Sequence, residues 1–317
     1  MIECFIYSFR AVAPILLMIL LGNLLSRKFL PQSFFDQSDK LVFKIALPIF
    51  LFCKLVESDL SHLPDPRAII FCVIAIISAF ILISLGAYLF IAPDKRGSFV
   101  HGSFRANFSI VGFVLAETIL GKTGATVIAC ATPFVIITSN ILAVTTLTVN
   151  MPREKRMPFG KIIIDILKNI VTNPLIIGVA AAIPFMVFKI KLPGIASDSL
   201  DYIKNIATPL ALLSLGAIDT SGEKGTIMPE AIVATAIKLI VLPSLFIVSA
   251  VLLGFRGESL GLVMILGTSP TAATSYIMSK SMHSNARLAK QIVLFTTLLC
   301  SLTIFIFAFI LKYLKLI

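Results

Sequence analysis

Apolar segments long enough to cross a lipid bilayer follow one another along almost the whole chain. A helix needs about 20 mostly apolar residues to cross roughly 30 Å of hydrocarbon. Ten segments fit this requirement: 8–26, 40–56, 68–92, 98–119, 124–148, 161–187, 200–218, 229–254, 259–279 and 288–314. Only 14% of the 317 residues are charged, whereas a soluble domain carries about 25%. The sequence therefore predicts an all-α integral membrane protein.

Short basic segments between the apolar runs predict the orientation. More Lys and Arg residues follow the odd-numbered spans than the even-numbered ones, and the densest cluster runs from Arg153 to Lys161. By the positive-inside rule, the 149–160 loop is expected in the cytoplasm and both termini outside. Because the basic residues are spread over these loops, the net charge of +11 does not predict nucleic-acid binding. The short central loop favours a bacterial inner membrane.

An internal repeat divides the chain. Ile-Ala-Leu-Pro at 45–48 recurs as Ile-Ala-Thr-Pro at 206–209, and Arg-Gly at 96–97 recurs at 256–257. Both offsets are about 160 residues, and because each half has an odd number of spans, the second copy enters the membrane from the opposite side, as in many secondary carriers. The predicted parts of this single membrane unit are a first five-helix repeat at 1–150, a linker at 151–160 and a second repeat at 161–317.

Helix breakers and polar residues interrupt the fourth and ninth spans at corresponding places. Pro270 cannot donate a backbone hydrogen bond and clashes with the preceding turn, so the ninth span is expected to break there. In hydrocarbon the freed backbone groups need neighbours, water or a ligand. In the fourth span, the carboxamide of Asn107 is expected to face the bundle interior. The predicted substrate-binding residues are Arg105, Asn107, Ser109, Ser269, Pro270, Thr271 and Thr274.

Each of these residues also has a purely structural interpretation. The hydroxyls could bond back to their own helix, Asn107 could join two helices, and Arg105 could reach the interface rather than attract an anion. Lys238 lies about 14 Å into the eighth span at 1.5 Å per residue. A lysine that deep either has a partner, lines a wet cavity or snorkels part of the way to the interface. Lys238 is therefore a candidate coupling residue, and Glu117 is a second one.

Signatures of catalysis and of metal binding are missing from the sequence. The cysteines have no metal-ligand spacing, and the three histidines are scattered over different segments. Gly121-Lys122-Thr123 resembles the end of a nucleotide-binding loop, but Ala116 stands where that loop needs its first glycine. We therefore expect no enzyme activity, no cofactor and no metal.

Several of these segments resemble the auxin efflux carrier family, which includes PIN-type auxin carriers of plants and malate- or malonate-type carriers of bacteria. The similarity covers nearly the whole chain and rests on Leu47-Pro48, on 103–108 leading to Gly112, on Asn173-Pro174-Leu175 and on 208–217. It implies ten helices in two inverted five-helix repeats, with broken helices four and nine crossing near the substrate beside a scaffold domain. The helices are expected to break at Gly112 and Pro270, and Pro48, Asn173 and Pro209 are expected on helices nearby. One departure is Val114, where the family often has proline.

The sequence thus predicts a secondary carrier that moves a small organic anion, such as a dicarboxylate or an auxin-like acid, by alternating access. Half-helix N-termini favour anions through their free N–H groups. Two alternatives stay open: a sodium-coupled symporter of the bile-acid type, and a receptor or sensor that binds without transport. The expected partners are the solute and the lipid bilayer. A homodimer is also left open.

Overall fold

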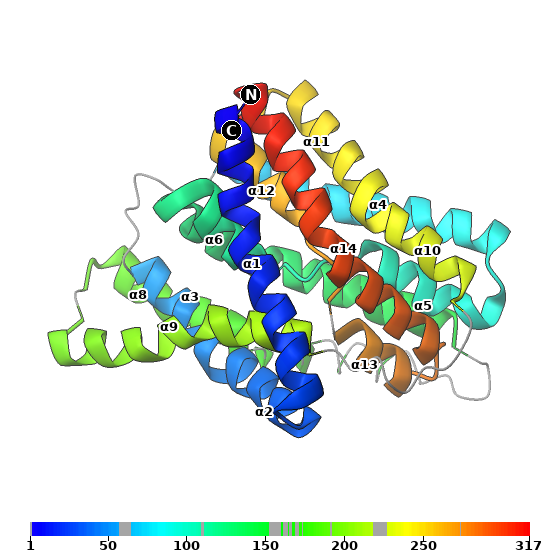
Figure 1. Cartoon of the computed structure of the whole chain (residues 1–317), viewed down its shortest axis with the longest axis horizontal. Coiled ribbons are helices and arrows are strands. Elements are labelled where there is room, and N and C mark those ends of the chain that lie inside the picture. The colour runs from blue at the N-terminus through cyan, green and yellow to red at the C-terminus, as the bar shows by residue number, and fades with distance from the viewer. Residues whose placement is uncertain are drawn as a thin grey trace.

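The computed structural model describes residues 2–317 except 57–64, 109–110, 152–159, 161–163, 165–166, 169–170, 173, 191, 218–226 and 273 (Figure 1). Two predicted site residues, Ser109 and Asn173, therefore lie outside the described residues. The first half contains α1 (Ile2–Lys28), α2 (Gln32–Leu41), η1 (Val42–Ala46), α3 (Leu47–Val56), α4 (Pro66–Phe90), α5 (Pro93–Phe104) and α6 (Val111–Val149). The second half contains α8 (Pro174–Val187), α9 (Gly194–Gly216), α10 (Pro229–Ala236), η4 (Ile237–Val241), α11 (Leu242–Leu252), α12 (Gly257–Thr268), α13 (Thr274–Ser281) and α14 (Ala286–Tyr313).

Helices make up all the regular structure in these described ranges. Two longer helices are each built from three consecutive elements. The chain passes from α2 through the π-helical turn η1 into α3, and from α10 through the π-helical turn η4 into α11, without leaving helical backbone angles. The helix α6 changes direction at Gly121, whose φ of 72° is open to glycine. Proline begins α4, α5, α8 and α10, where its missing N–H would have no helical partner in any case.

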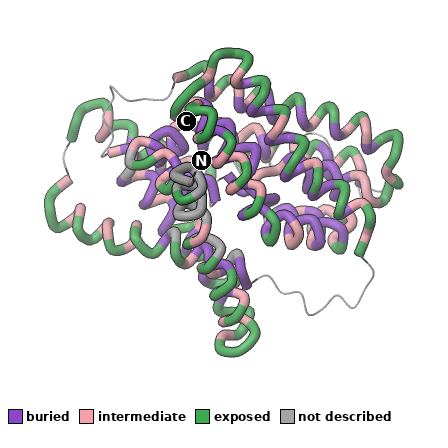
Figure 2. Tube along the Cα trace, turned by 45° about the horizontal axis from the view of Figure 1, so that its top comes forward, coloured by how far each residue is buried: buried purple, intermediate pink, exposed green. Residues whose placement is uncertain are grey.

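Four described stretches of helix are long and apolar enough to cross a membrane: Pro66–Phe90, Thr123–Val149, Pro229–Leu252 and Ala286–Tyr313. They coincide with the third, fifth, eighth and tenth predicted spans. Large apolar residues on them are exposed, including Leu82 and Leu302 at 63% and 61%. Exposed positions run along the outer sides of the helices (Figure 2). Such surfaces require lipid as their solvent, so the chain is an integral membrane protein.

The helices fall into two groups (Figure 1). In the first group, α9 packs against α1 and α3, and α8 packs against α3. Glycines allow this close approach, because a Cβ on Gly216 would lie 1.8 Å from the Ile19 carbonyl oxygen of α1, and a Cβ on Gly178 would lie 2.6 Å from the Pro48 carbonyl oxygen. Pro48 and Pro209, which were expected on helices near the crossing, both lie in this group, on α3 and α9.

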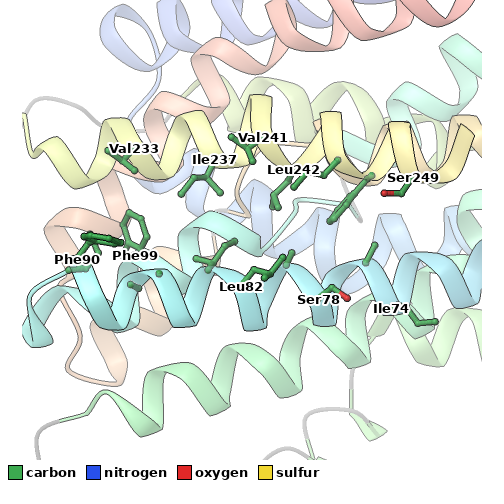
Figure 3. A pocket seen from close by; sticks show the side chains of 18 of the residues that line it. Ile74, Ser78, Leu82, Phe90, Phe99, Val233, Ile237, Val241, Leu242 and Ser249 are labelled. Atoms are coloured by element: carbon green, nitrogen blue, oxygen red, sulfur yellow. The ribbon is translucent and has the colours of Figure 1, made fainter. Parts of the chain in front are cut away.

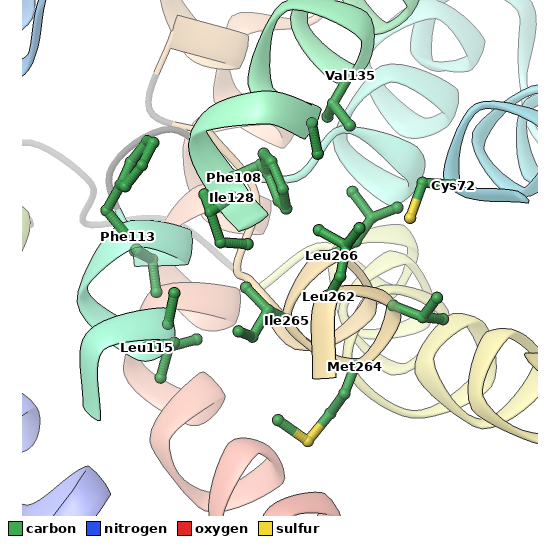
Figure 4. Close-up of a cluster of buried hydrophobic side chains, with 14 of the residues drawn as sticks. Cys72, Phe108, Phe113, Leu115, Ile128, Val135, Leu262, Met264, Ile265 and Leu266 are labelled. Atoms are coloured by element: carbon green, nitrogen blue, oxygen red, sulfur yellow. The ribbon is translucent and has the colours of Figure 1, made fainter. Parts of the chain in front are cut away.

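The second group surrounds α12. Every residue of α12 from Leu260 to Thr268 is buried, and α12 packs against α4, α6, α11 and α14. Figure 4 shows Leu262 and Ile265 of α12 together with Phe108 and Ile128, among other buried side chains. The two groups pack together along α1 and α14, and also where Phe50 of α3 stacks edge-on against Phe113 of α6, with ring centroids 5.4 Å apart.

Candidate substrate site at two helix breaks

Two half-length helices end inside the protein. Both α5 and α12 have 12 residues, which gives each a length of about 18 Å, well short of the roughly 30 Å hydrocarbon layer. The backbone then becomes extended, at Arg105 after α5 and at Ser269 after α12. Helical structure resumes at Val111 and at Thr274.

The two extended segments pair with each other. Ala106 and Thr271 form an isolated antiparallel bridge, and the Asn107 amide donates a hydrogen bond of 2.6 Å to the Pro270 carbonyl oxygen. Backbone groups freed inside a membrane must find partners within the protein or in water. Each break therefore supplies part of the hydrogen bonding that the other one needs, and the broken helices cross at this point.

Thr271 fixes the crossing in place. Its backbone amide donates to the Thr296 hydroxyl on α14 at 3.1 Å, and its own hydroxyl donates to the Gly102 carbonyl oxygen on α5 at 2.7 Å. Because Gly102 is in the last turn of α5, this bond satisfies a carbonyl that has no partner within its helix. Thr271 therefore holds three segments together.

Asn107 has a different position at the crossing. Its side chain is 5% exposed, and its backbone amide is already bonded to Pro270. Within the described part of the chain, no residue makes a hydrogen bond with the Asn107 carboxamide. This side chain can therefore offer two N–H donors and one carbonyl acceptor to a solute.

The other predicted hydroxyls do not converge on one point. Ser269 is fully buried and donates to the Ile265 carbonyl oxygen at 2.6 Å, so its hydroxyl is used within its own helix. Thr274 is exposed and is the first residue of α13. Pro270 is buried and contributes its carbonyl oxygen to the pairing of the two breaks.

A cation stands beside the end of each half-helix. The Arg105 side chain follows α5, and its Nη2 donates to Asn140 Oδ1 on α6 at 2.7 Å. The Lys238 side chain, on η4, is 1% exposed, and its Nζ donates to the Gly267 carbonyl oxygen in the last turn of α12 at 3.2 Å. Positive charge is favourable at a helix C-terminus, where carbonyl groups lack partners.

The remaining predicted residues take no part in the hydrogen bonds described above for the crossing. Gly112 is buried in the first turn of α6, and a Cβ on it would lie 3.4 Å from the Phe108 ring. Glu117 is half-buried further along α6. On α3, Pro48 lies against α8, and Pro209 is exposed on α9.

A separate apolar cavity of about 590 Å³ lies between α4 and the α10–η4–α11 helix (Figure 3). Its lining includes Leu82, Phe90 and Leu242, and its polar side chains are Ser78 and Ser249. None of the predicted site residues lines it. Its apolar lining suits hydrocarbon.

Polar partners that the sequence analysis missed complete the crossing. Asn140 and Thr296 bind the predicted residues from α6 and α14, and Gly102 contributes a carbonyl oxygen. The signal for Asn140 was a carboxamide within an apolar span, the same signal that identified Asn107. Nothing comparable marks Thr296, because its span holds other hydroxyl residues.

A buried polar crossing of two broken helices, enclosed by apolar helices, is the arrangement found in secondary transporters. The chain belongs to the membrane transport protein family, whose model matches residues 7–308. It is also 25% identical over 285 residues to a protein of Methanocaldococcus jannaschii described as an uncharacterised transporter. That similarity covers 86% of this chain and 88% of the archaeal protein.

Proposed function

We propose that this membrane transport protein is a secondary carrier for a small organic anion, with the solute held at the crossing of the two broken helices. The observation that carries the proposal is the Asn107 carboxamide. It is almost fully buried and lacks a protein partner among the described residues, at a point where two helix breaks are already paired through Pro270 and Thr271. Its N–H and C=O groups are not engaged by another described residue, so a bound solute could use them.

The electrostatics of the crossing favour an anion. The helices α6 and α13 begin at Val111 and Thr274, a few residues after the paired segments, and helix N-termini attract negative charge through their unpaired N–H groups. Lys238 and Arg105 add two cations. Among the described residues, no carboxylate forms an ion pair with either of them. A solute carboxylate would balance this charge.

We further propose that the protein works by alternating access. In the inverted-repeat arrangement expected for the two halves, the helices around the crossing move against the α1–α3–α8–α9 group and expose the site to each side in turn. The edge-on contact between Phe50 and Phe113 lies between these groups and would have to rearrange during the movement.

Uptake of labelled organic acids into proteoliposomes tests the proposal. We expect saturable uptake of at least one acid, and we expect Asn107→Ala to reduce it about 10- to 100-fold. A hydrogen bond to a charged group contributes about 1.5–3 kcal/mol, and every 1.4 kcal/mol is roughly tenfold in affinity. The matched control is Asn150→Ala, because Asn150 donates to a carbonyl of its own helix at the far end of α6.

Three outcomes would contradict parts of the proposal. Equal uptake by wild type and Asn107→Ala would mean that the substrate site does not lie at the crossing. Uptake that requires sodium would favour the sodium-coupled symporter. Binding of an acid without any uptake would favour a receptor or sensor.

A further inference from the structure

The short helix α13 is fastened along α5 at both of its ends. Before its start, the Thr271 hydroxyl bonds to the Gly102 carbonyl oxygen of α5. Beyond its end, the Ser284 and Ser98 hydroxyls lie 2.9 Å apart, and the Ser284 amide bonds back to the Ser279 carbonyl oxygen of α13 at 2.8 Å. These contacts define a seam between α5 and α13 that leads away from the crossing.

Buried polar atoms without hydrogen-bond partners occur on both sides of this seam. On α5, neither ring nitrogen of His101 has a hydrogen bond among the described residues, and the same is true of Arg105 Nη1. Arg105 follows the end of α5, and its amide bonds back to the His101 carbonyl oxygen at 3.2 Å. On α13, the hydroxyls of Ser275 and Ser279 are also unpartnered. They are four positions apart, and both serines are fully buried.

Several other buried hydroxyls in this protein bond within their own helix. Ser103, Thr132 and Thr268 each donate to the carbonyl oxygen four residues earlier in their own helix, at 2.7–2.8 Å. Ser275 and Ser279 make no such bond. Because unpartnered polar groups in a buried site are unfavourable, a seam that gathers several of them is suited to a polar ligand.

We propose that the side chains of His101, Arg105, Ser275 and Ser279 form a subsite for an oxyanion carried by the solute. This proposal rests on the proposed function and extends it to a second acidic group of the solute. Arg105 Nη1 would supply a charged N–H donor, and the His101 ring and the two hydroxyls would each supply a neutral one. A carboxylate offers about four lone-pair sites, which matches these four donors.

Thermal unfolding of the detergent-purified protein, with and without ligand, tests the subsite. The variants are His101→Phe and the more conservative pair Ser275→Ala with Ser279→Ala. Without ligand, we expect their Tm to equal or exceed that of wild type, because each change removes buried polar atoms that lack partners. With succinate as the probe, we expect an affinity at least tenfold weaker than that of wild type.

Butyrate separates the subsite from the crossing, because it has four carbons like succinate but only one carboxylate. We expect its weaker stabilisation to be the same in wild type and in both variants. The matched control is Ser103→Ala on α5, which removes an equally buried hydroxyl that already has a partner. We expect it to leave the succinate response unchanged.

The result that overturns the subsite is a succinate response that is lost in Asn107→Ala but intact in His101→Phe and in the serine pair. In that case the proposed function stands, and the seam holds only water. A fall in Tm of both seam variants without ligand would also overturn it, since the groups would then be structural. If no organic acid stabilises wild type, the anion carrier and its subsite are both wrong.

Discussion

Thr271 and Asn107 were both predicted as substrate-binding residues, but the structure gives them different surroundings. The backbone amide of Thr271 donates a hydrogen bond to Thr296, and its hydroxyl donates one to Gly102. The Asn107 carboxamide has no such engagement within the described residues. A residue whose bonds are already made positions the crossing, and a residue whose bonds are free can bind a solute. Of the two, Asn107 is therefore the better candidate for direct contact.

Lys238 provides a prediction at the scale of one residue. We expect Lys238→Met to lower anion uptake at least tenfold, about 1.4 kcal/mol, because it removes the buried positive charge beside the end of α12. We expect the free energy of unfolding not to fall, since burying a charge without an opposite charge is itself unfavourable. Uptake assays and thermal unfolding measure the two effects.

Lys44→Met is the matched control, because Lys44 also lies on a π-helical turn but is exposed. It should leave uptake unchanged. If Lys238→Met transports at the wild-type rate, the ammonium group has no part in solute binding. If the variant loses stability together with uptake, the hydrogen bond to Gly267 is a structural requirement instead.

The residue types at the crossing could be predicted, but their partners could not. Pro270 and Asn107 stand out because a helix breaker and a carboxamide are conspicuous in apolar spans. Whether Asn140, Thr296 and His101 face the site depends on how each of their helices is rotated about its own axis. In spans that are apolar on every side, periodicity does not fix that rotation, so the sequence leaves the facing residues open.

At the scale of elements, the two breaks form with different local causes. Pro270 ends α12 directly. The break between α5 and α6 has no proline, and Val114, at the position where the related carriers often have one, is buried inside helical α6. Pairing with the segment at 270–271 satisfies the backbone there instead. The break in the fourth span therefore depends on the ninth.

Close packing between α1 and α9 makes a second prediction. We expect Gly216→Ala to destabilise the protein by about 1–3 kcal/mol, because its Cβ would lie 1.8 Å from the Ile19 carbonyl oxygen and the two helices would have to separate. Gly86→Ala on α4 is the control, since a Cβ there has nothing within 4 Å. Thermal unfolding in detergent compares them, and equal Tm values for both variants would contradict the close approach.

The π-helical turns η1 and η4 were not predicted. The hydropathy of the sequence shows one continuous apolar segment through each of these turns. A single widened helical turn does not change that hydropathy. The turn matters at η4, because it carries Lys238, which reaches the Gly267 carbonyl oxygen. Local backbone geometry of this kind depends on contacts with neighbouring helices, which a single sequence does not contain.

At the scale of the whole molecule, hydropathy predicted best the helices that touch lipid. The third, fifth, eighth and tenth spans match described helices to within two residues at each end, because lipid contact demands apolar side chains over a full membrane thickness. The remaining spans correspond to helices that are broken, shorter or more polar. Neighbouring helices shield these segments from lipid, which allows breaks and polar residues in them. The same breaks and polar residues make the segments harder to recognise by hydropathy.

The inverted repeat, the two predicted halves and the outside location of both termini stay predictions about the whole molecule. The pairing of α5 with α12 at matching breaks is consistent with two related halves. Membership of the membrane transport protein family supports transport, and the nature of the solute is our proposal. The decisive property is therefore binding at the crossing.

The most direct measurement is the thermal stability of the purified protein against a panel of organic acids, for wild type and for Asn107→Ala. A ligand that binds only the folded state stabilises it by RT ln(1 + [L]/Kd), about 2.7 kcal/mol at a concentration 100 times Kd. We predict that at least one acid raises the Tm of wild type and that Asn107→Ala loses this rise. Stabilisation by neutral or cationic solutes alone, or an equal rise in both proteins, would contradict an anion site at the crossing.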